Sequence, residues 1–151
     1  MKKIFFTLIF ILVGISNAQY LSVSGEWNYT IPTSDISEAG EDFTGTYTSD
    51  ANQTYIDVWY WRNWRVNIQK NNIDWNDDID IYARRTGNGW GSSSRINGGT
   101  NFTRIRDKSN NFFRGRGWNY YLPIQYEIRN ISVTIPAHTY IVEILYTLQA
   151  N

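Results

Sequence analysis

The sequence predicts an all-β protein built as a sandwich of antiparallel sheets, and two observations predict it. Apolar residues recur at every second position in several segments, which is typical of strands with one buried face, whereas the spacing expected for helices is weak throughout. Segments rich in Gly, Asn, Asp and Pro separate these short strand-like stretches. That arrangement is characteristic of β-sandwiches.

Residues 1–18 have the pattern of a secretory signal peptide. They begin with a positively charged end that contains two lysines, continue with an apolar run over residues 4–15, and finish with a small-x-small cleavage site. We expect cleavage before Gln19 and a single domain over residues 19–151. The mature protein is therefore expected to be secreted, periplasmic or exposed at the cell surface.

The N-terminal half of the domain is expected to contain four strands. Apolar and polar residues alternate over residues 21–31, and a polar loop over residues 32–48 ends in a short strand of Thr and Tyr. The strongest alternation covers residues 54–69, and a break near Arg62 divides it into two strands. One set of alternate residues in this block is expected to face the core: Ile56, Val58, Tyr60, Trp64, Val66 and Ile68.

The C-terminal half is expected to continue with shorter strands and one long final strand. Residues 70–72 begin a connection, residues 79–84 alternate as a strand, and residues 86–100 form a loop of Gly, Ser and Asn. A hairpin turn at residues 136–139 is expected to place His138 in a left-handed backbone conformation, which His tolerates better than most residues. Further strands are expected at residues 102–106, 110–114, 124–135 and 140–148.

The composition excludes several classes of site. The sequence contains no cysteine, so the protein has no disulfide, no thiol chemistry and no thiolate metal site. Its stability must come from burial of its many aromatic and β-branched residues. After the signal peptide, no segment approaches the roughly 20 apolar residues that a membrane-spanning helix needs.

Charge argues against nucleic acid as a partner. Once the two N-terminal lysines are removed with the signal peptide, acidic residues slightly outnumber basic ones. The charged residues are mainly acidic over residues 19–82 and mainly basic over residues 83–151. Two interpretations remain open: the charges of the two halves pair across neighbouring strands, or the molecule is dipolar and suited to head-to-tail association.

Tryptophans are the strongest indication of a binding site. Trp59 and Trp61 lie on the parity opposite to the expected core set, while Trp90 and Trp118 occupy Gly-rich segments. Such rings stack on sugar rings and also form protein interfaces. The alternative is a central strand whose two faces are both covered. We identify Trp59, Trp61 and Trp90 as candidate ligand-binding residues.

No catalytic site is predicted. His138 is the only histidine, so any histidine-dependent triad or metal site would have to use it, and a turn residue is the simpler interpretation. Glu26, Glu127 and Glu143 lie in strand-like segments, where an outward-facing carboxylate is the plain explanation. The protein is therefore expected not to be an enzyme and to use no cofactor.

An acidic run at residues 74–80 resembles the start of a calcium-binding loop, but it does not match the EF-hand pattern. Counting from Asp74, Ile79 stands where the EF-hand loop requires Gly, and Arg85 stands where it requires a bidentate Glu. A calcium site of another type between strands and a solvated polar turn are both open, and no metal ligand is assigned.

Several segments resemble a known family. They are Trp64–Val66, Ile79–Arg84, the loop at residues 87–91, and Ile135–Tyr140 followed by a long strand. Together they resemble secreted bacterial β-sandwich proteins of the spore-coat-protein-U and archaic chaperone-usher pilin type, in which Gly stands at the position of His138. The resemblance implies an immunoglobulin-like sandwich that assembles by strand donation, with residues 19–31 as the candidate donor strand.

Two functions follow as hypotheses. The first is an exported structural or adhesion-type subunit, whose partners would be other protein subunits at a surface or in a pilus-like assembly. The second is a carbohydrate-binding module that contacts cell-surface glycans through its exposed tryptophans. A central question is whether residues 20–31 pair within their own chain or with a neighbour.

Overall fold

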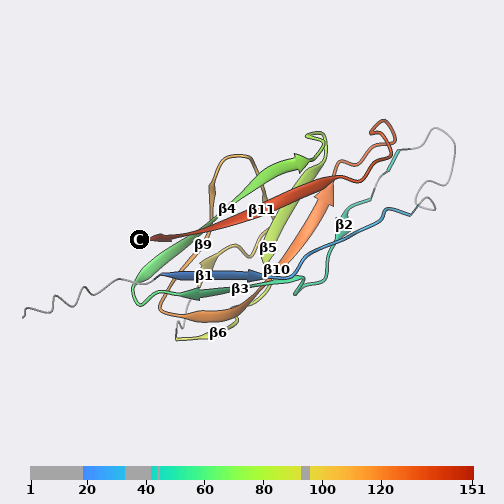
Figure 1. The fold of residues 1–151 in the computed structure, drawn as a ribbon. Coiled ribbons are helices and arrows are strands. Elements are labelled where there is room, and N and C mark those ends of the chain that lie inside the picture. The colour runs from blue at the N-terminus through green and yellow to red at the C-terminus, as the bar shows by residue number, and fades with distance from the viewer. Residues whose placement is uncertain (1–18, 33–41, 44, 93–95) are drawn as a thin grey trace, which may run out of the picture.

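The computed structural model describes residues 19–32, 42–43, 45–92 and 96–151, which form two antiparallel sheets packed face to face (Figure 1). The predicted β-sandwich is confirmed. The predicted signal peptide and most of the expected loop at residues 32–48 lie outside the described residues. Within the described part of the chain, no helix has the length and apolarity needed to cross a membrane.

The first sheet, sheet A, is organised around one long strand, β10 (Asn119–Arg129). Its main order is β1 (Tyr20–Ser24), β3 (Thr54–Trp59), β10, β5 (Asp80–Arg85) and β8 (Thr103–Arg104). Two short strands, β2 (Tyr47–Thr48) and β6 (Trp90–Gly91), also pair with β10. Four earlier strands, β2, β3, β5 and β6, therefore pair with β10.

The second sheet, sheet B, contains four strands. Their order is β11 (Ile141–Ala150), β4 (Asn63–Asp74), β9 (Asn110–Arg116) and β7 (Asn97–Gly98). Strand β4 follows β3 after a three-residue turn, so the chain passes directly from one sheet to the other, as the predicted break near Arg62 requires. Strands β1 and β11 are edge strands of the two sheets, and they lie on the same side of the sandwich, where residues of both line a groove.

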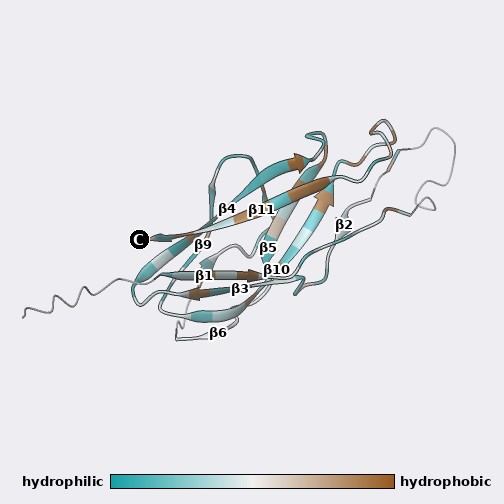
Figure 2. Cartoon of the chain, viewed as in Figure 1, coloured by the Kyte–Doolittle hydropathy of each residue, from teal (hydrophilic) through white to brown (hydrophobic). Residues whose placement is uncertain are grey.

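The core consists of the residue set that the alternation predicted. All six members, Ile56, Val58, Tyr60, Trp64, Val66 and Ile68, are buried. They pack in one cluster with inward-facing residues of β9, β10 and β11. Hydrophobic and hydrophilic residues accordingly follow one another along β4 and β11 (Figure 2). Trp64 is the largest fully buried side chain, and its Nε1 donates to the Gly117 carbonyl at 2.7 Å.

The first strand is shorter than predicted. Strand β1 ends at Ser24, because Gly25 adopts a φ of +107°, which is outside the strand region. Only Gly fits at this position, since a Cβ there would lie 2.6 Å from the Gln53 carbonyl oxygen. The five residues of β1 pair with β3 of the same chain, from Tyr20 opposite Trp59 to Ser24 opposite Tyr55. Residues 25–31 continue without strand pairing, so the prediction of one strand over 21–31 was wrong.

Strand β4 is longer than predicted. Residues 70–72 were expected to begin a connection, yet β4 continues through them to Asp74. The reason is the final strand: β11 pairs with β4 along this polar stretch, with Ile144 opposite Lys70 and Val142 opposite Asn72. Backbone pairing with a distant segment therefore outweighs the turn propensity of the local sequence.

The expected hairpin around His138 was also wrong. Strands β10 and β11 belong to different sheets, so residues 130–140 cross between the sheets, and residues 132–135 form a turn within the expected strand. Asn130 and Tyr121 are the non-glycine residues with positive φ in the described part of the chain. His138 instead places its Nε2 2.7 Å from an Asp74 carboxylate oxygen.

Candidate functional site

The three predicted binding residues are exposed in the structure. Trp59 ends β3 on the outer face of sheet A with 38% exposure, and Trp61 lies in the following turn with 53% exposure, beneath the Arg62 guanidinium. Trp90 begins β6 and is 67% exposed. Of the two interpretations of Trp59 and Trp61, the structure therefore supports exposure over burial beneath a loop.

Trp90 belongs to a cluster of three aromatic rings. The register of β6 on β10 places Trp90 opposite Tyr120, and Trp118 lies just before β10. The ring centroids of Trp90 and Trp118 are 4.9 Å apart, and those of Trp118 and Tyr120 are 5.5 Å apart. Trp90 and Tyr120 are 6.4 Å apart with an interplanar angle of 25°, so two rings of the cluster are close to parallel.

A β-bulge adds a further aromatic ring. Asn119 pairs with Val58 and Leu122 pairs with Ile56, so β10 has one residue more than β3 between these pairs. Tyr121 takes up the extra length with a φ of 55°, and its N–H donates to an Asp57 carboxylate oxygen at 2.8 Å. As a result Tyr121 is 64% exposed.

Together these side chains form one surface, which we call the aromatic face. Tyr121 contacts Tyr55 edge-on at 6.0 Å, and Tyr20 is paired in register with Trp59. The members of the aromatic face lie on β1, β3, β6, the start of β10 or the residue just before it, and are Tyr20, Tyr55, Trp59, Trp90, Trp118, Tyr120 and Tyr121. Asp57 and Ser22, an in-register pair, supply polar groups beside the rings.

Glycines allow the segment that carries Trp90 to approach β10 closely. A Cβ on Gly91 would lie 2.2 Å from the Trp118 carbonyl oxygen, and a Cβ on Gly89 would lie 2.2 Å from that of Tyr120. Gly89 also has a φ of +61°. Beyond the glycines, Ser92 Oγ accepts a hydrogen bond from the Trp118 N–H at 2.9 Å. The Gly-Asn-Gly-Trp-Gly sequence is thus explained by close backbone packing under the aromatic face.

A buried arginine holds the same segment from inside. Arg85 is 4% exposed, and its Nη1 donates to the Gly87 carbonyl and to Asn88 Oδ1, each at 2.6 Å. Its Nη2 donates to the Gly98 carbonyl at 3.0 Å. Burial lowers the pKa of Arg85 from its usual high value. Four neutral oxygen acceptors, including the Ile96 carbonyl, surround this cation.

Most of the acidic residues considered for catalysis or calcium binding have separate protein partners. Asp77 accepts from Lys70 Nζ at 2.9 Å, which with the charge of Lys70 lowers the Asp77 pKa, and Asp80 pairs with Arg104. Glu127 is buried beside Arg129, and Glu143 accepts from Asn71. In the described part of the chain, no group of three or more acidic or histidine residues could hold a metal ion.

Sequence reasoning missed Tyr120 and Tyr121. The signal was present, because Trp118, Tyr120 and Tyr121 stand close together in the chain. Regular alternation would send Tyr120 and Tyr121 to opposite faces, and only the bulge leaves both outside the core. Comparison with family models, with curated proteins and with solved structures gave no match.

Proposed function

We propose that this protein is an exported, non-enzymatic adhesion-type protein that binds carbohydrate through the aromatic face of sheet A. The observation that carries the proposal is the cluster of Trp90, Trp118 and Tyr120, whose outermost ring is two-thirds exposed. Large aromatic rings are costly to leave in water, so a surface that displays several of them together fits a ligand with apolar faces.

Sugar rings have that character. Their C–H groups form apolar faces that pack on aromatic rings, while their hydroxyl groups need hydrogen-bond partners at the edge of the contact. Asp57 and Ser22 provide such partners next to the rings. The bulge, the glycine contacts and the Arg85 hydrogen bonds fix the backbone that carries the rings, so little conformational entropy is lost on binding.

Replacing Trp90 by Ala is the direct test. Binding to a panel of soluble polysaccharides is measured by affinity electrophoresis and by calorimetry. For a ligand of the wild-type protein, we expect Trp90→Ala to weaken binding by about 1.5 to 3 kcal/mol, which is roughly tenfold to a hundredfold. Trp90→Phe, which keeps a smaller ring, should retain part of the affinity.

The matched control is Ile73→Ala. Ile73 is 60% exposed, so it is a comparably accessible apolar side chain, but it lies on β4 in sheet B. This control should bind as the wild type does. Equal affinities of wild type and Trp90→Ala for every polysaccharide that binds would refute the proposal.

A second candidate function is a structural subunit that assembles with other chains. The observation that favours it is a groove of about 530 Å³ between the edge strands β1 and β11. Apolar and aromatic side chains such as Val23, Trp27 and Ile144 line it. Unpaired edges beside an apolar groove are the features that strand donation uses.

A further inference from the structure

A row of polar and basic residues crosses the outer face of sheet B. The strand registers place Asn97 opposite Arg114, Arg114 opposite Arg65, and Arg65 opposite Gln149. One step further along, Asn63 is opposite Arg116. We call Arg65, Arg114 and Arg116 the arginine face. The residues around them are carboxamides.

These arginines carry positive charge without a compensating carboxylate. None of the three forms an ion pair with any residue that the structure describes, and Arg65 Nε is buried without a hydrogen-bond partner. Arg65 Nη2 donates only to a neutral group, Gln149 Oε1, at 3.1 Å. Like charges that are directly opposite on neighbouring strands destabilise a sheet. A bound anion would remove that cost.

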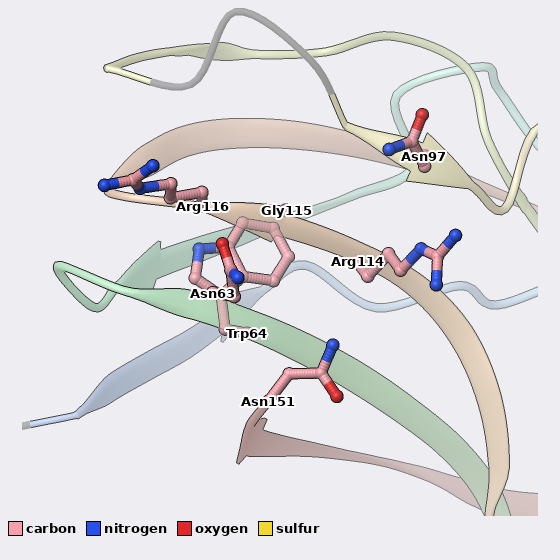
Figure 3. Close-up of a pocket in the computed structure, with 7 residues that line it drawn as sticks. All are labelled: Asn63, Trp64, Asn97, Arg114, Gly115, Arg116 and Asn151. Atoms are coloured by element: carbon pink, nitrogen blue, oxygen red, sulfur yellow. The ribbon is translucent and has the colours of Figure 1, made fainter.

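The surface here is hollowed. A cavity of about 290 Å³ is lined by Asn63, Trp64, Asn97, Arg114, Gly115, Arg116 and Asn151. Figure 3 shows the guanidinium groups of Arg114 and Arg116 pointing away from each other along β9, with Asn97 above Arg114 and Asn63 below Arg116, next to Trp64. Alternate residues of a strand are about 7 Å apart. The geometry therefore suits several negative charges along an extended chain better than one small anion.

The arginine face adjoins the aromatic face. Arg116 ends β9 in sheet B, and Trp118 follows two residues later at the start of β10 in sheet A. The Gly117 N–H between them donates to the Arg62 carbonyl at 3.2 Å, which connects this junction to the turn that carries Trp61. Residues 116–118 therefore link the end of the arginine face, on sheet B, to the start of the aromatic face, on sheet A.

We propose that the arginine face binds the carboxylate or sulfate groups of an acidic polysaccharide, one negative group per arginine. The choice of a saccharide rests on the proposed function of the adjoining aromatic face. Two local features support it. Guanidinium groups bind planar or tetrahedral oxyanions with paired hydrogen bonds, and the surrounding carboxamides both donate to and accept from hydroxyl groups. A nucleic acid backbone would need donors alone, and the balanced charge of the whole chain disfavours it.

The test compares polymers that differ in charge. Polygalacturonate supplies carboxylates, dextran sulfate supplies sulfates, dextran is the uncharged control, and single-stranded DNA is the phosphate polymer. We expect the full mature chain to bind one or both acidic polysaccharides, more weakly as salt rises. The affinity of the double variant Arg114→Gln/Arg116→Gln for the acidic polysaccharide should fall about tenfold or more for each charge-assisted contact removed.

The matched control is Arg106→Gln/Lys108→Gln, which removes the same charge from the turn between β8 and β9. Its affinity for the acidic polysaccharides should stay within about twofold of that of the wild type if the contacts are specific. An equal loss in both double variants would show a nonspecific charge effect and overturn the inference. So would the absence of binding to both acidic polysaccharides, or tighter binding to DNA.

Failure of this inference can be told apart from failure of the proposed function. Trp90→Ala tests the aromatic face and Arg114→Gln/Arg116→Gln tests the arginine face. Without any ligand, Arg114→Gln should unfold at the same or a higher temperature than wild type, because it removes the repulsion with Arg65. A clear loss of stability in Arg114→Gln would indicate a structural role and contradict the inference.

Discussion

At the scale of single residues, Arg85 connects the core to the aromatic face. Its side chain is buried, and it donates to oxygen atoms of residues 87, 88, 96 and 98, on both sides of Trp90. A guanidinium presents several donors in a fixed plane, whereas an ammonium group has three donors and no such geometry. The residue is therefore expected to position Trp90 without touching the ligand.

We predict that Arg85→Lys destabilises the protein by about 2 to 4 kcal/mol, because buried carbonyl oxygens lose their donors. Urea unfolding measures this change. The same variant should increase quenching of tryptophan fluorescence by acrylamide and weaken polysaccharide binding. Arg84→Lys is the matched control, since Arg84 lies one position earlier and bonds to Gln125 on the other face. Unchanged quenching and affinity in folded Arg85→Lys would contradict the positioning role.

The burial of residues in strongly alternating segments could be predicted from sequence. The backbone conformation of residues whose partners are distant in the chain could not. The burial of the core residues in β3 and β4 followed from their parity in a strongly alternating block, whereas parity left open whether Trp59 and Trp61 are exposed or covered. The left-handed conformation was expected at His138 and occurs at Asn130 and Tyr121. Tyr121 adopts it because two pairs of residues on β3 fix the register on either side of it. His138 has no positive φ, since β10 and β11 lie in different sheets and no tight hairpin turn is formed between them.

At the scale of elements, the pairing of β1 bears on the structural-subunit hypothesis. It pairs over five residues with β3 of its own chain, but Val23 remains 43% exposed and the opposite edge of β1 is not part of sheet A's pairing order. Beyond β1, Trp27 stacks on Tyr126 at 6.3 Å with an interplanar angle of 14°. The N-terminal segment therefore covers one side of the core in the same chain.

We predict that the mature protein is a monomer and that deleting residues 19–31 lowers its stability by about 2 to 4 kcal/mol. The loss comes from the half-buried Leu21 and Trp27 and from the hydrogen bonds to β3. Urea unfolding and size-exclusion chromatography measure the two outcomes. Denaturant-resistant oligomers of the intact protein would contradict the monomer and favour strand donation between subunits.

Strand positions were largely predictable, but their ends and partners were not. Alternation in the local sequence located β3, β4, β5 and β11, because each has one face in the core. The excess length of β4 and the division of the last two long strands between two sheets depend on pairing between distant segments. Such pairing leaves no periodic trace in the segment itself.

At the scale of the whole molecule, a chain of hydroxyl groups joins the two sheets. Tyr126 of sheet A and Tyr146 of sheet B place their hydroxyl oxygens 2.8 Å apart, and Thr54 Oγ1 lies 2.9 Å from that of Tyr126. Burial raises the pKa of Tyr126. Burial, together with the neighbouring charge of Tyr126, raises the pKa of Tyr146 well above its ordinary value.

These shifts predict loss of stability in alkaline solution. The folded protein holds the two phenolic protons more tightly than the unfolded chain, whose tyrosine pKa is about 10. Stability from this source is therefore complete below about pH 10 and falls as the pH rises further. Urea unfolding from about pH 8 to 11 measures the slope. Tyr146→Phe should unfold more easily at neutral pH and show a shallower alkaline decline than wild type. The exposed Tyr20→Phe is the control, and an unchanged slope in Tyr146→Phe would contradict the prediction.

The central place of β10 in sheet A also sets when the protein folds. Strands β2, β3, β5 and β6 all pair with β10, which is complete only at Arg129 of a 151-residue chain. Strand β4 in turn pairs with β11, which follows β10 in the chain. Sheet A is therefore complete only after β10 has been synthesised and sheet B only after β11, and pairing over such sequence distances is slow. A chain that remains open during its own synthesis is in the state that threading through a translocation pore requires, so this strand order is compatible with the export that we propose.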